Sequence, residues 1–183
     1  MSQRHATQEG TFHVTTNTKG KISWLTFSGV PKIIMDNLVM TRNVQHAEIF
    51  AFCILPDHMH ILVRPGKKGL SKFMQSFKRN AAKDVRYCLN GRAEKHIDTE
   101  YRSGDSGISA WTAANADSPL RLSNTICISW QKGFHDERIQ DDRQRSHAWR
   151  YITENALHHG LTENIDDWPW TSVHWEKILD PME

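Results

Sequence analysis

The stretch EIFAFCILPDHMHILVR, residues 48–64, decides the fold, because its pattern predicts two strands joined by a turn. Residues 48–55 are almost entirely apolar, as a buried strand requires, and residues 58–64 resume the extended pattern. Pro56 and Asp57 lie between them and favour a turn. A connection this short makes the two strands antiparallel neighbours.

The second of these strands carries two histidines, His58 and His60, on either side of Met59. Side chains alternate between the faces of a strand, so both imidazoles point to one face and Met59 to the other. Two neutral imidazoles held side by side make half of a metal site. In a chain with 11 histidines among 183 residues, chance supplies roughly 0.65 such pairs, so the motif needs corroboration.

Working outward, the pattern predicts a strand at 11–18, a helix at 32–47, a helix at 69–91, and a strand, turn and strand over 125–139. A last helix begins near Asp141 and continues to Gly160, with His158 and His159 capping its C-terminal turn. Residues 98–124 lack periodicity and are expected to form a loop or insertion. The β-α-β-β-α-β order predicts an α+β, ferredoxin-like antiparallel sheet with helices on one face and an added C-terminal helix.

Length and composition indicate one domain, residues 1–183, with a core of its own. Apolar residues make up 38% of the chain, the mean hydropathy is −0.60, and no apolar run is long enough to span a membrane. The polar N-terminus lacks the apolar stretch of a secretory signal. The three cysteines form no CxxC pair and are typical of a reducing compartment, so we expect a cytoplasmic protein.

Basic residues concentrate after the histidine strand, although the net charge of the chain is only +2. Residues 61–95 hold ten lysines and arginines but only two acidic residues, a pattern that attracts a polyanion. The alternative is an ordinary solvated helix face. The candidate DNA-binding residues are Arg64, Lys67, Lys68, Lys72, Lys78, Arg79, Lys83 and Arg86.

Two residues of the last helix, Tyr151 and Asn155, supply the chemistry that the histidine pair lacks. They are four positions apart, so they stack on one helix face at the border of its apolar stripe. An asparagine carbonyl oxygen suits a hard divalent ion such as Mg²⁺ or Mn²⁺, and a tyrosine can act as a nucleophile on phosphate. The alternative for Tyr151 is a border residue that packs its ring and leaves its hydroxyl in water.

The ordered set LPDHMHILVRP, LSKFMQSFKRNAAK, WQKGFHDERI, WRYITENALHHGL and DWPWTSVH resembles the single-tyrosine HUH transposases, and among them the REP-associated tyrosine transposases. The resemblance extends from about residue 11 to residue 175. His58, Met59 and His60 match the His-hydrophobic-His motif of that family, and Tyr151, Ile152 and Asn155 match its Tyr-Ile-x-x-Asn block. That block usually continues Asn-Pro-Val, whereas this chain has Asn155-Ala156-Leu157, so we expect the helix to continue for another turn.

The resemblance implies cleavage of single-stranded DNA beside a hairpin, with Tyr151 forming a 5′-phosphotyrosine and His58, His60 and Asn155 holding Mg²⁺ or Mn²⁺. The expected partner is hairpin DNA of the REP type, no membrane is involved, and the protein acts as a monomer or a homodimer. Gln131 either orients the strand end or is a turn residue, and His135 and Asp136 are candidates for supporting the site, although core or surface roles remain open to both.

Two other functions compete with this reading. One is a regulator that binds hairpin DNA without cutting it, for which the intact Tyr151, His58 and His60 would be unnecessary. The other is a zinc hydrolase with a metal-activated water. Against it, this sequence offers no acidic general base near the histidines other than Asp57.

Overall fold

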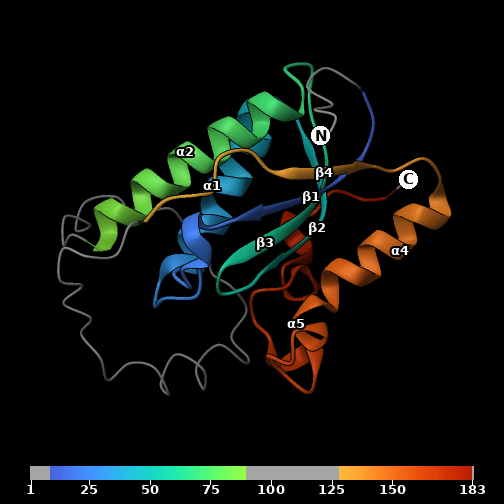
Figure 1. Ribbon diagram of the computed structural model, residues 1–183. Coiled ribbons are helices and arrows are strands. Elements are labelled where there is room, and N and C mark those ends of the chain that lie inside the picture. Colours follow the sequence, from blue (N-terminus) through green and yellow to red (C-terminus); the bar gives the residue numbers. More distant parts are fainter. Residues whose placement is uncertain (1–8, 90–127, 183) are drawn as a thin grey trace.

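The computed structural model describes residues 9–89 and 128–182, and at its centre lies a four-stranded antiparallel sheet (Figure 1). The strands are β1 (Phe12–Asn17), β2 (Glu48–Ile54), β3 (His58–Arg64) and β4 (His135–Arg138), in the order β2-β3-β1-β4. The predicted hairpin is present as β2 and β3, and β1 lies between β3 and β4. The expected α+β, ferredoxin-like arrangement is confirmed.

Helices cover both faces of this sheet. Figure 1 shows α1 (Val30–Gln45) and α2 (Leu70–Leu89) on one side and α4 (Asp142–Thr153) on the other. The helix α2 presents Phe73, Phe77 and Val85 to the core, as its apolar stripe predicts. Asp141 caps the start of α4 by accepting a hydrogen bond from the backbone of Gln144.

Strand alternation and register decide which side chains face α4. Thr15 lies opposite His60 across the β1–β3 pair, and residues opposite each other share a face. Tyr151 of α4 contacts the ring of His60, so this is the α4 face of the sheet. The alternate residues Val14 and Met59 face α1 and α2 and are fully buried.

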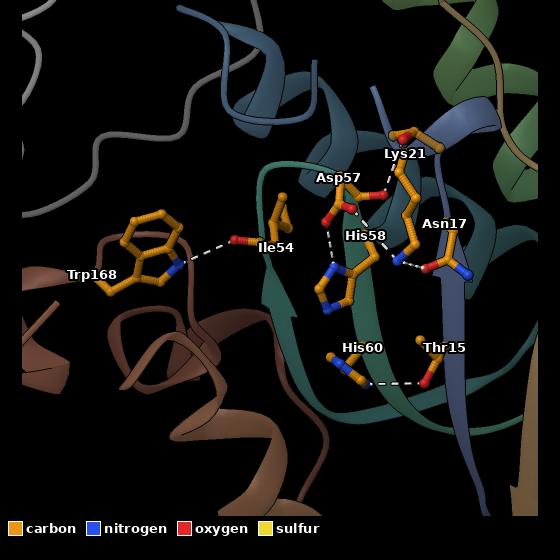
Figure 2. Close-up of polar contacts among 9 residues, drawn as sticks. Thr15, Asn17, Lys21, Ile54, Asp57, His58, His60 and Trp168 are labelled. Carbon is orange, nitrogen blue, oxygen red and sulfur yellow. Dashed lines mark hydrogen bonds and ion pairs between the residues drawn. The ribbon is translucent and has the colours of Figure 1, made fainter. Parts of the chain in front are cut away.

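The C-terminal segment lies along the outer edge of β2, through a short helix α5 (Asn155–His158) and three 3-10 turns, Ile165–Asp167, Ser172–His174 and Glu176–Ile178. The amide of Ile54 donates to the carbonyl of Trp170 at 2.9 Å, and the indole of Trp168 donates to the carbonyl of Ile54 at 3.1 Å (Figure 2). The Arg42 guanidinium pairs with Asp180 near the chain end. These contacts cover a strand edge that would otherwise be unpaired.

Two predicted elements differ from the structure. The last helix is not continuous to Gly160, because it is interrupted at Glu154 and a separate short helix, α5, follows. The Thr153 hydroxyl donates to the carbonyls of Trp149 and Arg150, and such back-bonding bends a helix.

The second difference concerns the strand expected before the turn at Lys132. In its described part, from residue 128, only an isolated bridge between Thr18 and Trp130 forms. The carbonyls of Gln131 and Gly133 are instead taken by the Lys78 ammonium group. The predicted loop at 98–124 lies outside the described residues. Among those described, no helix is long and apolar enough to cross a membrane.

Candidate active site

Strand β3 holds His58 and His60 side by side on the α4 face, with their ring centroids 5.2 Å apart (Figure 2). Both are buried, with 7% and 5% of their surface exposed. The Nδ1 atom of His58 lies 2.6 Å from a carboxylate oxygen of Asp57, and Nδ1 of His60 lies 3.1 Å from the Thr15 hydroxyl and 3.0 Å from Nε2 of His13. With the hydrogen on Nδ1, His58 donates to Asp57 and His60 donates to Thr15 or His13, and this tautomer leaves the Nε2 lone pairs available to a ligand.

The electrostatics keep both imidazoles neutral. Burial lowers the pKa of His58, although the neighbouring Asp57 carboxylate acts in the opposite direction. Burial, followed by the nearby rings of His13 and His58, lowers the pKa of His60 to about 3. Burial alone would raise the pKa of Asp57, but the contacts with His58 and with Lys21 outweigh it and lower that pKa. The pair is therefore in the protonation state that binds metals.

Tyr151 and Asn155 come from the two sides of the break at Glu154. The ring of Tyr151 is 39% exposed and lies 5.6 Å from the ring of His60, at an angle of 88°. Asn155 is fully buried, and its amide oxygen and nitrogen have no hydrogen-bond partner among the described residues. An orphaned buried amide is costly, so it indicates a missing partner.

These groups fit a divalent cation. Within the described ranges no three His, Cys, Asp or Glu residues come together as a metal cluster, so a third protein ligand to a cation here would be of another type. The Asn155 amide oxygen is the candidate, because α5 brings the next residues against the histidines and the ring of His159 lies 5.0 Å from that of His58. Two imidazole nitrogens with one amide oxygen suit Mn²⁺ or Mg²⁺ with open positions for phosphate oxygens.

Sequence reasoning missed several members of this cluster. His13, which the sequence did not single out, contacts both His60 and Tyr151, with a ring distance of 5.8 Å to the tyrosine. His158 and His159, expected only to cap a helix, place their rings against Tyr151 and His58. The alternation of β1 puts His13 and Thr15 on one face, but nothing local in the sequence pairs that face with His60.

A groove of about 680 Å³ opens between β4 and α4, with Tyr151 and His60 in its wall. His135 also lines it, so this candidate is brought to the site. Asp136 lies opposite Val14 and faces the other side of the sheet, where it is buried. Gln131 is exposed; its backbone amide donates to Asn17, which makes it part of a turn at the end of β1.

The basic candidates lie elsewhere. Helix α2 is on the opposite side of the sheet from α4, so the structure does not bring its charges to Tyr151 (Figure 1). Lys78 and Arg86 donate to backbone carbonyls of residues 128–133, and Arg64 pairs with Glu48 at 2.8 Å. The exposed remainder is Lys67, Lys68, Lys72, Arg79 and Lys83.

Comparisons with known proteins agree with this arrangement. A family model described as "Transposase IS200 like" matches residues 6–103, which is more than half of the chain. A curated protein of Haemophilus influenzae, named as a REP-associated tyrosine transposase, is 28% identical over 133 residues, which cover 69% of this chain and 59% of that protein. A solved structure described as a REP-associated tyrosine transposase bound to a REP hairpin has the same fold, with a TM-score of 0.64, 19% identity and coverage of 99% of this chain and 88% of that one. With an exposed tyrosine beside two buried histidines at the centre of its fold, the chain belongs to the IS200-like transposase family.

Proposed function

We propose that this protein is a metal-dependent single-stranded DNA endonuclease and strand transferase that acts at hairpins of the REP type through a 5′-phosphotyrosine. The observation that carries the proposal is the exposed Tyr151 packed against His60, a buried, neutral member of the histidine pair, in the wall of an open groove. The similarity to a relative named as a REP-associated tyrosine transposase, and to a structure described as bound to a REP hairpin, supports the choice of substrate. The free thiols Cys53 and Cys88 suit the reducing cytoplasm as its location.

In the proposed reaction the Tyr151 hydroxyl oxygen attacks the scissile phosphorus. The bond from phosphorus to the 3′ oxygen breaks, the phenol loses its proton, and the departing 3′ oxygen gains one. The tyrosine then carries the 5′ phosphate as an ester, which a second 3′ hydroxyl can attack to reseal the strand. Because the phosphoryl bond is exchanged and not hydrolysed, no external energy source is needed.

The remaining residues orient the reacting groups. Asp57 holds His58 through its Nδ1 atom, and Thr15 with His13 holds His60 in the same way, which fixes the orientation of both rings. A divalent cation bound by His58, His60 and Asn155 would neutralise charge on the phosphate as the transition state forms. The groove gives the single strand a path to Tyr151 beside His135.

The test is a reaction with a hairpin oligonucleotide that carries single-stranded flanks, followed by mass spectrometry of the denatured protein. Wild type with Mn²⁺ should yield a covalent adduct at Tyr151, and excess chelator should abolish it. Tyr151→Phe should keep the fold and hairpin binding but form no adduct, while Tyr87→Phe, which alters an exposed tyrosine of α2, should react normally. Binding without any adduct in the wild type would instead favour a non-cleaving regulator.

A further inference from the structure

The ring of His158 stacks on the ring of Tyr151, with centroids 5.6 Å apart and planes inclined by only 22°. The two residues are seven positions apart, and in a continuous α-helix seven residues span about 10.5 Å along the axis. A stacked contact is out of reach in a straight helix. The backbone of Glu154 (φ −88°, ψ 5°) departs from helical geometry and separates α4 from α5, so the two residues do not lie on one continuous helix.

Three imidazole rings contact the Tyr151 side chain within the described structure. Its hydroxyl makes no hydrogen bond to any described residue, and its ring touches three imidazoles. The rings of His60 and His13 meet it at steep angles of 88° and 61°, whereas His158 is nearly parallel to it. His13 and His60, on the strands, therefore limit the position of the Tyr151 ring relative to the sheet. His158, in the C-terminal segment, limits the tilt of that ring.

The element that carries His158 is anchored, as a positioning role requires. Asn155 and Ala156 of α5 are buried, and the backbone of Ala156 hydrogen-bonds the Cys53 thiol of β2. The amides of Gly160 and Leu161 donate to the carbonyls of Leu157 and Ala156, which closes the turn after His158.

We propose that His158 is a positioning residue for the nucleophile: its ring holds the Tyr151 phenol at the tilt at which the hydroxyl faces the His58–His60 pair. The catalytic consequence rests on the proposed function, in which Tyr151 attacks the phosphate. The stacking contact between His158 and Tyr151 does not depend on the proposed function. A ring is required at position 158, but not a titrating one.

The contact can be measured without metal or DNA by ¹⁹F NMR of protein labelled with 3-fluorotyrosine. The chain has three tyrosines, so Tyr151→Phe identifies the resonance of Tyr151. His158→Ala should shift that resonance alone, and His158→Phe should leave it near the wild-type position. His174→Ala, at an exposed histidine of the C-terminal segment, is the matched control and should shift none. An unchanged Tyr151 resonance in His158→Ala would overturn the proposal.

The catalytic arm measures the rate of adduct formation at saturating hairpin oligonucleotide. A stacked aromatic pair of ordinary strength predicts a loss of about two- to tenfold in His158→Ala, with hairpin affinity unchanged. His158→Phe should restore the rate. A Phe variant as slow as the Ala variant would mean that the imidazole nitrogens matter and that stacking does not explain the role. If the wild type forms no adduct, the proposed function is wrong, and so is the catalytic role of His158. The NMR experiment still tests whether His158 stacks on Tyr151.

Discussion

Replacing Asn155 by leucine should stabilise the metal-free protein while abolishing cleavage. Asn155 is fully buried, and neither polar atom of its side chain has a hydrogen-bond partner among the described residues. An unsatisfied buried polar group costs about 1–3 kcal/mol of folding free energy, and leucine, which has the same branched arrangement of side-chain heavy atoms, does not carry that cost. For a domain of this size, 1 kcal/mol corresponds to about 2–4 °C, so the melting temperature in chelator should rise by roughly 2 to 12 °C.

The matched control is the same substitution at Asn37, a buried asparagine of α1 whose side-chain nitrogen is engaged, although its amide oxygen has no hydrogen-bond partner among the described residues. Its amide nitrogen donates to the carbonyl of Ile33 and to Asp84 of α2, each at 3.0 Å. Asn37→Leu should therefore lower the melting temperature, because it removes both bonds and leaves Asp84 without that partner.

A second measurement, thermal unfolding with and without Mn²⁺, separates a ligand role for Asn155 from simple packing. A cation that binds only the folded state stabilises it by about 2.7 kcal/mol at a hundredfold excess over Kd. Wild type should gain melting temperature with Mn²⁺, and Asn155→Leu should gain much less. The reasoning is refuted if the leucine variant is less stable than wild type in chelator, or if Mn²⁺ stabilises both proteins equally.

Two further predictions concern pH and salt. The pKa of His60 is lowered to about 3, so between about pH 6.5 and pH 3 the unfolded chain binds a proton at this residue that the folded chain does not. The free energy of unfolding should therefore fall as the pH is lowered through this range. His60→Gln should reduce the loss of stability measured between urea-unfolding curves at pH 7 and at pH 5. Changing Lys72, Arg79 and Lys83 together to glutamine should weaken hairpin binding and reduce the slope of log K against log salt by up to about 0.9 per lost phosphate contact. The control variant Lys32→Gln on α1 should change neither the affinity nor the slope. An unchanged slope in the triple variant would mean that α2 faces away from the DNA.

Alternation along residues 58–64 was enough to place His58 and His60 side by side, because the side-chain period of a strand is two wherever the strand lies. The short turn at Pro56 and Asp57 likewise determined the β2–β3 hairpin, and the apolar stripe of residues 70–89 determined which face of α2 is buried. These are local properties, since each depends on residues that are close in the chain. The four-residue spacing of Tyr151 and Asn155 was also visible in the sequence, but it predicted one continuous helix, and the structure places a break at Glu154 between them.

Only the tertiary structure decided which groups surround the His58–His60 pair. His13 reaches His60 across 47 positions of sequence because β1 pairs with β3 in one register, and a shift of a single residue would turn His13 to the other face. The helical period of the last helix did not reveal the break at Glu154, after which Asn155 and Ala156 are buried and the ring of His158 stacks on that of Tyr151. The basic stripe of α2 was visible in the sequence, but its side of the sheet follows from how the two helix layers pack, and that places it opposite the nucleophile.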